Sequence, residues 1–314
     1  MTLQKIILLF TVLFSITCHA QKWDQEKITV TKANVTSKIM SAESIFEERW
    51  DGLAQAQFWK EIMLLSSDSC IINVASSREI LRKMSNRDWE RQSEVEKNNL
   101  KLQLKTSHNI ALDERVYITI GKSDFYKFHE VYPSLAKGVS AFENAGVDPW
   151  YAQSILLIES PGQLQKSVAG AYGAFQLMPG VARTYGLVVN STQDERKDFN
   201  RSAYAAAQLI SRVCIPEAKR ILDRHQLTYK ETDLWFRLFV LHVYHAGAQN
   251  VAAVVSKINP TEGSKVLIQS MWCTTAASFG NNSQNYSQLA LAAQLILNDM
   301  IYHDCDDIIH CSSK

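Results

Sequence analysis

The chain has 314 residues, and its 33 Lys and Arg residues nearly balance its 32 Asp and Glu residues, for a formal net charge of +1. Neither sign is collected in a long block, which argues against nucleic acid or an anionic membrane as the main partner, because both favour a basic patch. The length suits one large domain, or a core domain with an added subdomain.

The first twenty residues have the pattern of a secretory signal peptide. Lys5 is followed by an apolar run, residues 6–16, and a short Cys-His-Ala sequence precedes Gln21. We therefore predict cleavage after residue 20 and export of a soluble product, since no later segment approaches the roughly 20 apolar residues of a membrane helix. A lipid anchor on Cys18 is the alternative, but the residues just before it fit that signal poorly.

Five cysteines follow the signal peptide, and an exported protein meets oxidising conditions. We expect up to two disulfides and one free thiol among Cys70, Cys214, Cys273, Cys305 and Cys311. The tail, residues 301–314, also contains His303 and His310, which raise zinc as an alternative. Its spacing matches no standard zinc site, so a disulfide loop or separate thiols are favoured and no metal is expected.

Residues 21–130 show little that points to chemistry. Residues 21–44 are polar and are expected to form a flexible lead-in. Residues 45–130 form an N-terminal extension of unknown role, mostly helical in pattern, with short strands expected at "CIINVA" (70–75) and "ERVYITIG" (114–121). The charged run 77–105 has the spacing of one or two amphipathic helices.

Residues 131–300 have an almost wholly helical pattern. Helices are expected at 132–146 and at 148–160, where Asp148 is the N-cap and Pro149 the first helical residue. Further helices are expected at 179–186, 200–214, 216–226, 232–247, 248–258 and 285–300. The fold class is therefore mainly α, within α+β, with a small β element before residue 125.

One carboxylate stands out because Glu159 ends an apolar helical run and precedes a Ser-Pro-Gly break. The carbonyl groups at that helix end and the apolar neighbours both disfavour an ionised carboxylate and raise its pKa. A carboxyl group that is protonated near neutral pH can donate a proton to a leaving group, as cleavage of a glycosidic bond requires. The alternative is an ordinary glutamate exposed at a helix end.

Three blocks decide between these interpretations. Glu159 and Ser160 are followed by "S-x-A-G-A-x-G-x-x-Q-L-M-P-G-x-A-x-x-Y-G-L" (167–187), then by "HVYHAGAQNV" (242–251) and "NNSQNYSQLAL" (281–291). In this order they resemble the lytic transglycosylases with a lysozyme-like catalytic domain, of the soluble-lytic-transglycosylase type. The resemblance covers about 145 residues, less than half of the chain.

The resemblance implies a lysozyme-like domain over residues 131–300 and a cut between N-acetylmuramic acid and N-acetylglucosamine in peptidoglycan. Glu159 would be the sole acid and base, forming a 1,6-anhydro ring without water and without a cofactor. The residues implied to bind the substrate are Ser160, Ser167, Gln176, Tyr244, His245 and Tyr286. It also implies the periplasm of a Gram-negative bacterium, glycan strands as the partner, and other cell-wall proteins as candidate partners of the extension.

Two departures from the family pattern bear on the sugar site. The stretch between Glu159 and Gly170 is one residue shorter, and the link from Pro161 to Lys166 lacks the usual aromatic residue. His245 stands where the family has asparagine, and histidine titrates near neutral pH. We therefore expect His245 to make activity depend on pH.

Two other functions stay open. A hydrolytic muramidase on the same fold generally needs a second carboxylate roughly 5 to 9.5 Å away, and the nearest acidic candidates are Asp194, Glu195 and Asp198. The altered spacing and His245 also allow a catalytically impaired protein that binds the cell wall or serves as a scaffold.

Overall fold

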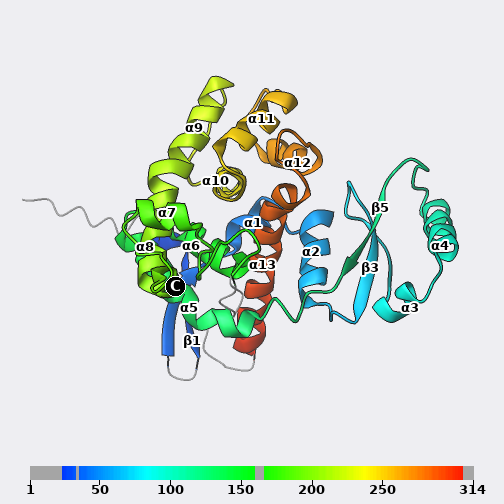
Figure 1. Ribbon diagram of the computed structural model, residues 1–314, viewed down its shortest axis with the longest axis horizontal. Helices are drawn as coiled ribbons and strands as arrows, with labels where there is room; N and C mark the ends of the chain where they lie inside the picture. The colour runs from blue at the N-terminus through cyan, green and yellow to red at the C-terminus, as the bar shows by residue number, and fades with distance from the viewer. Residues whose placement is uncertain (1–22, 33–34, 160–165, 307–314) are drawn as a thin grey trace, which may run out of the picture.

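The computed structural model describes residues 23–32, 35–159 and 166–306, without the side chains of residues 32, 35 and 303–306 (Figure 1). The expected signal peptide with Cys18, Ser160, residues 161–165 of the link, and the Cys and His side chains of the tail lie outside the described residues. The described chain is mostly helical, with two small antiparallel sheets in its N-terminal part, so the predicted α+β class is confirmed.

The segment expected to be a flexible lead-in forms regular structure instead. Strands β1 (Lys27–Lys32) and β2 (Val35–Met40) pair as an antiparallel hairpin after a short 3-10 turn, Asp24–Glu26. The side chain of Gln153 accepts a hydrogen bond from the Met40 N–H at 2.8 Å and donates one to the Met40 carbonyl at 3.0 Å. The prediction is therefore wrong for residues 24–32 and 35–40, because partners far along the chain hold β2 against the helices.

Four helices form the centre of the molecule: α5 (Phe128–Asn144), α6 (Pro149–Glu159), α10 (Leu234–Ala246) and α13 (Asn281–Asp306). Helix α13 runs through the middle and contacts α6, α10 and also α2 (Ala54–Leu64) (Figure 1). Every residue of α6 from 149 to 158 is buried. Helices α5 and α6 approach closely because Gly138 has no side chain, and a Cβ there would lie 2.5 Å from Leu156 Cδ1.

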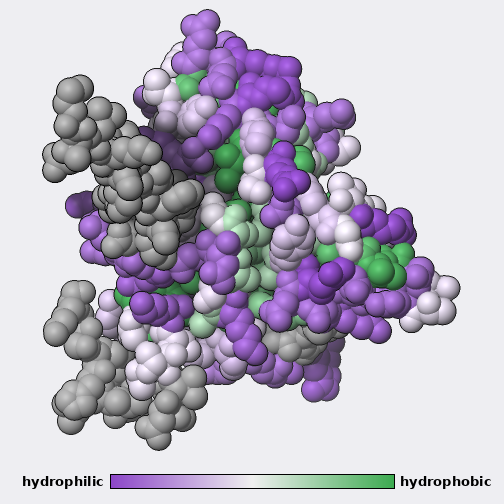
Figure 2. Space-filling model, turned by 90° about the vertical axis from the view of Figure 1, so that its left-hand side faces the viewer, coloured by the Kyte–Doolittle hydropathy of each residue, from purple (hydrophilic) through white to green (hydrophobic). Residues whose placement is uncertain are grey.

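Shorter helices surround this centre, and most agree with the predicted positions. They are α1 (Glu43–Glu47), α7 (Pro179–Thr184), α8 (Phe199–Leu209), α9 (Ile215–Arg224), α11 (Ala248–Ile258) and α12 (Lys265–Cys273). A π-helical turn, Ile210–Cys214, joins α8 to α9. Helix α12 was not predicted. The face that carries α7, α8 and α9 is mostly hydrophilic, with hydrophobic residues in small areas between polar ones (Figure 2).

The predicted extension, residues 45–130, divides between two cores. Helices α1 and α2 belong to the main core, whereas β3 (Ser69–Val74), β4 (Ile80–Ser85), β5 (Val116–Ile120), α3 (Asn86–Glu90) and α4 (Glu94–Ser107) form a unit that we call the β-subdomain. Its sheet has the order β4-β3-β5, and its separate core contains Ile72, Val74, Leu81 and Leu104. The β-subdomain projects to one side of the helical body (Figure 1).

The strands predicted at 70–75 and 114–121 are confirmed as β3 and β5, whereas the helical prediction for 77–105 is wrong at its start. Residues 80–85 pair with β3. The helices begin only after two serines, Ser85 and Ser93, whose hydroxyls accept from backbone N–H groups of the first turn. Pairing with β3 therefore makes residues 80–85 a strand, and helix begins only where a serine caps its first turn.

Three expectations about chemistry and location can be compared with the described residues. Cys70, Cys214 and Cys273 are free thiols, so none of these three joins the expected disulfides. The described side chains contain no cluster of His, Cys, Asp or Glu suited to a metal ion. None of the described helices combines the length and the apolar character needed to cross a membrane.

Candidate functional site

Glu159 is the last residue of α6, and its carboxyl group lies deep in the fold while the residue keeps part of its surface accessible. Burial among protein atoms raises the pKa of the carboxyl to about 7, and the Tyr286 hydroxyl opposes this shift. No ion pair joins Glu159 to another described residue, so its charge is not compensated by a cation. The group therefore holds a proton through much of the range below neutral pH.

Three phenol groups from different parts of the chain face this carboxyl. Tyr286 is on α13, Tyr244 is on α10, and Tyr126 precedes α5. Burial is the largest cause that raises the pKa of each phenol, and the nearby Glu159 charge adds to it. The Tyr286 hydroxyl is buried without a hydrogen-bond partner of normal geometry among the described residues, yet it lies close enough to favour the ionised form of Glu159. Tyr126 was missed because no motif marks it.

The glycine-rich block 167–187 forms a tight loop beside the site. Tyr172 and Leu177 exchange backbone hydrogen bonds at 3.1 and 3.0 Å, and residues 173–176 make the turn between them. Gly173 has φ +86°, and a Cβ there would lie 2.0 Å from the Arg196 carbonyl oxygen. Gln176 also has positive φ, +45°, which is costly for a residue with a side chain. This turn is a strained feature built on a required glycine.

Arg196 fixes this loop, and the sequence did not reveal its role. It is 2 % exposed, and its Nη1 donates to the carbonyl oxygens of Gly170 and Leu177, each at 2.8 Å. Its other nitrogens donate to Asp194 at 2.9 and 2.7 Å. The buried guanidinium thus holds the loop together at Gly170 and Leu177, and the same contacts satisfy its donors.

The three acidic candidates for a second catalytic carboxylate have structural partners. Asp194 pairs with Arg196, and Glu195 accepts from the Val188 N–H and pairs with Arg201. Asp198 caps α8 by accepting from the Arg201 N–H at 2.8 Å. None of them appears among the groups that shift the pKa of Glu159.

Three of the predicted substrate-binding residues make hydrogen bonds within the protein. The Tyr244 hydroxyl donates to the Phe175 carbonyl oxygen at 2.6 Å and so ties α10 to the glycine-rich loop. The Ser167 hydroxyl accepts from the Ala171 N–H at 2.9 Å, which closes the start of the loop. Gln176 is partly exposed and donates to the Gly173 carbonyl oxygen at 3.2 Å.

His245 and Tyr286 form a stacked pair, with ring centroids 4.3 Å apart and an interplanar angle of 17°. Tyr286 is only 2 % exposed, so the His245 ring covers a phenol that itself faces Glu159. His245 is exposed although it lies beside buried groups, as a residue in a recess does. The desolvation that lowers its pKa is therefore partial.

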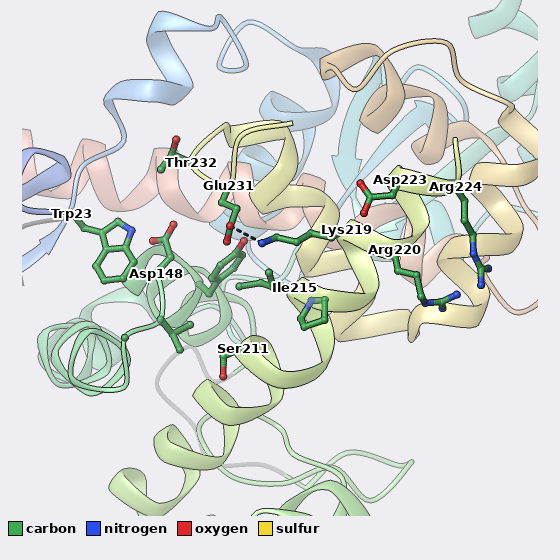
Figure 3. Close-up of a pocket in the computed structure, with 14 residues that line it drawn as sticks. Trp23, Asp148, Ser211, Ile215, Lys219, Arg220, Asp223, Arg224, Glu231 and Thr232 are labelled. Atoms are coloured by element: carbon green, nitrogen blue, oxygen red, sulfur yellow. Dashed lines mark hydrogen bonds and ion pairs between the residues drawn. The ribbon is translucent and has the colours of Figure 1, made fainter. Parts of the chain in front are cut away.

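A large cavity of about 740 Å³ lies at the opposite end of α6, beside Asp148 (Figure 3). Lys219 and Glu231 form an ion pair of 2.6 Å among its lining residues. Asp148 is tied to Arg237 at 2.8 Å and accepts from the Trp150 N–H at 2.9 Å. Lys219, Glu231 and Asp148 thus each have an ion-pair partner, whereas Glu159 has none among the described residues, and we therefore place the candidate active site at Glu159.

The structure thus brings together Glu159, Tyr244, His245, Tyr286 and the loop that carries Ser167 and Gln176. A scan against protein-family models gave no match, and a search of curated proteins gave no significant match.

Proposed function

We propose that the protein is an exported lytic transglycosylase that cleaves the β-1,4 bond between N-acetylmuramic acid and N-acetylglucosamine in peptidoglycan. The observation that carries this proposal is the buried carboxyl group of Glu159 at the end of α6, which has no ion pair with a described residue and whose pKa is raised to about 7. The sequence resemblance supports the same assignment. The periplasm is the proposed location, and glycan strands are the proposed partner.

The proposed reaction uses Glu159 twice. The protonated carboxyl gives its proton to the glycosidic oxygen, and the bond from that oxygen to the muramoyl C1 breaks while the N-acetyl oxygen assists at C1. The resulting carboxylate then removes the proton from the C6 hydroxyl, whose oxygen attacks C1 and closes the 1,6-anhydro ring. Glu159 regains its proton, so the atoms balance without water or a cofactor. A pKa near neutrality suits both steps.

The surrounding side chains have roles consistent with this chemistry. Tyr286 and Tyr244 face the carboxyl and limit the water around it. Gln176 carries both a donor and an acceptor on a rigid turn, which suits an acetamido group. His245 is accessible beside the Tyr286 ring and can donate to or accept from a sugar hydroxyl.

A hydrolytic muramidase is the second candidate, and it needs a carboxylate to activate water or stabilise the sugar cation. Asp194, Glu195 and Asp198 are engaged by Arg196, Arg201 and the start of α8. This arrangement favours a mechanism in which the substrate supplies the nucleophile.

The deciding experiment incubates purified protein with peptidoglycan sacculi and weighs the released muropeptides. Anhydromuramoyl ends, lighter than reducing ends by one water, support the proposal, whereas reducing ends support a hydrolase. Binding to sacculi without release supports the impaired wall-binding protein. Glu159→Gln must abolish release, and Glu130→Gln, at an exposed position of α5, is the matched control that must retain it.

A further inference from the structure

Arg78, in the turn between β3 and β4, is a buried cation without a carboxylate partner among the described residues. It is 7 % exposed and has φ +63°. Its guanidinium carbon lies 5.4 Å from the Phe58 ring centroid, 5.7 Å from that of Trp59 and 6.0 Å from that of Tyr117. Burying a cation costs free energy unless specific contacts offset the cost, so its position calls for a physical reason.

That reason lies at the start of α13. Arg78 Nη2 donates to Asn285 Oδ1 at 2.7 Å, and Asn281 Oδ1 lies 3.4 Å from the same nitrogen. Trp59, against which Arg78 packs, donates from Nε1 to Gln288 Oε1 at 3.1 Å. Asn285 and Gln288 are three residues apart and therefore share one face of the helix. These two contacts hold the turn of α13 that carries Tyr286.

A neighbouring face of the same α13 turn is held by residues of α10 and α12. Ser287 Oγ accepts from Trp272 Nε1 at 2.7 Å and lies 2.8 Å from Nε2 of His242. Burial lowers the pKa of His242 to about 3, so this imidazole is neutral and accepts from the serine hydroxyl. The turn is thus fixed between α10 and α12 on one side and Trp59 with the β-subdomain on the other.

We propose that the β-subdomain is a working part of the Glu159 site, because Arg78 positions the first turns of α13 and thereby holds the Tyr286 hydroxyl against the Glu159 carboxyl. Arg78 acts as a positioning residue and touches no reacting atom. This inference rests on the proposed function for its kinetic consequence only, since the placement of Tyr286 can be measured without turnover.

The measurable consequence follows from the groups that face Glu159. These are Tyr286 of α13, Tyr244 of α10 and Tyr126 before α5, with His245 of α10 stacked on Tyr286. Of the three phenols, only the Tyr286 hydroxyl lies close enough to the carboxyl to favour its ionised form. If Arg78 no longer holds the helix turn, that contact weakens and the carboxyl retains its proton to higher pH.

The test uses the full-length protein with Arg78→Met, Tyr286→Phe, the double variant, and Arg82→Met as the matched control on the exposed side of β4. Carbon-13 NMR of glutamate-labelled protein follows the titration of Glu159, whose signal is assigned with Glu159→Gln. Rates on sacculi are measured over the same pH range. Trp59→Phe keeps an aromatic ring but loses the five-membered part of the indole, including the donor to Gln288, and it serves if Arg78→Met does not fold.

We expect Arg78→Met and Tyr286→Phe each to move the Glu159 titration and the alkaline limb of kcat to higher pH. The double variant should shift no further than Tyr286→Phe alone, because Arg78 acts through Tyr286. For Arg78→Met, kcat should fall about tenfold with KM changing less than about twofold, as for a group misplaced by a fraction of an ångström. Arg82→Met should match the parent.

The proposal is overturned if Arg78→Met lowers the melting temperature while the Glu159 titration stays in place, or if the two shifts add fully in the double variant. Either result leaves Arg78 with a structural role alone. If Glu159→Gln retains activity, the proposed function fails, but the NMR titration still decides whether Arg78 positions Tyr286.

Discussion

The two ends of α6 carry buried carboxyl groups with opposite surroundings. Asp148, at the first turn, contacts the Arg237 guanidinium and the Trp150 N–H. Glu159, at the last turn, faces phenols and has no ion pair with a described residue. Burial pushes the pKa of both groups upward, but only at Asp148 do a cation and a helix N-terminus oppose it. One helix therefore carries a carboxyl paired with a cation at one end and, at the other, a carboxyl whose pKa is raised to about 7.

The Asp148 end of α6 should be the more sensitive to the loss of a partner, because its carboxylate is paired with Arg237. Arg237 is 1 % exposed and also binds Glu26 at 2.6 and 3.0 Å, so Arg237→Met leaves two carboxylates without a cation. We expect the free energy of unfolding to fall by about 3–5 kcal/mol, measured by urea denaturation at pH 7. Replacing the exposed Arg220 in the same way should change it by less than about 0.5 kcal/mol. Equal effects of the two substitutions would contradict the assignment.

At Glu159 we expect the opposite result: replacing the carboxyl group should raise the free energy of unfolding. The folded-state pKa of Glu159, about 7, lies above the ordinary 4.5, so the folded protein binds more protons between these values. The stability that Glu159 contributes is therefore fully present below pH 4.5 and is lost as the pH rises through 7. Glu159→Gln removes this cost, so the variant should be more stable than the parent by up to about 3 kcal/mol at pH 8.

At pH 4 the same two proteins should differ by less than about 1 kcal/mol, since the parent carboxyl is then protonated in both states. Denaturant titrations of both proteins at the two pH values measure the difference. A gap that does not depend on pH would mean that Glu159 titrates normally.

We expect a smaller loss of stability where Tyr244 of α10 contacts the glycine-rich loop. Tyr244→Phe removes the donor to the Phe175 carbonyl oxygen and leaves that carbonyl without this partner. The expected loss is about 1–2 kcal/mol, read from thermal or denaturant unfolding. Tyr229→Phe, which removes an exposed hydroxyl contact with Asp223, is the control and should cost clearly less.

The smallest change concerns pH dependence at the rim of the site. Desolvation lowers the pKa of His245, so its imidazole gains a proton at a lower pH than an ordinary histidine does. We expect His245→Asn to change the rate at pH 7 by less than about threefold and to flatten the decline on the acid side. If the acid sides of the two pH–rate profiles coincide, the role proposed for His245 is wrong.

What the sequence predicts well about α6 is local. The N-cap at Asp148 and the direction of the Glu159 pKa shift both follow from neighbours within a turn or two. What it misses depends on residues far along the chain. Arg237, Arg196 and Tyr126 are unremarkable in the sequence, because their partners lie on other elements.

The same reasoning explains the errors in the fold. Residues 27–40 were expected to be flexible, yet they pack because Gln153 and α5 hold β2. Residues 80–85 were expected to be helical, yet β3 offers them a strand partner. The structure brings Tyr286 of the third block near Glu159 and covers it with the His245 ring, a stacking that could not be deduced from spacing.

The central place of α13 also has a consequence for how the chain folds. Helix α13 contacts α2, α6 and α10, and its Gln288 and Gln294 bind Trp59 and Gln153, residues separated from them by 229 and 141 positions. During synthesis these earlier segments leave the ribosome before α13 does, so they cannot form these contacts until it emerges. Contacts between such distant residues slow folding, because a long loop must close before they form. A chain cut before residue 281 would therefore leave an open apolar trough, which invites chaperone binding or aggregation.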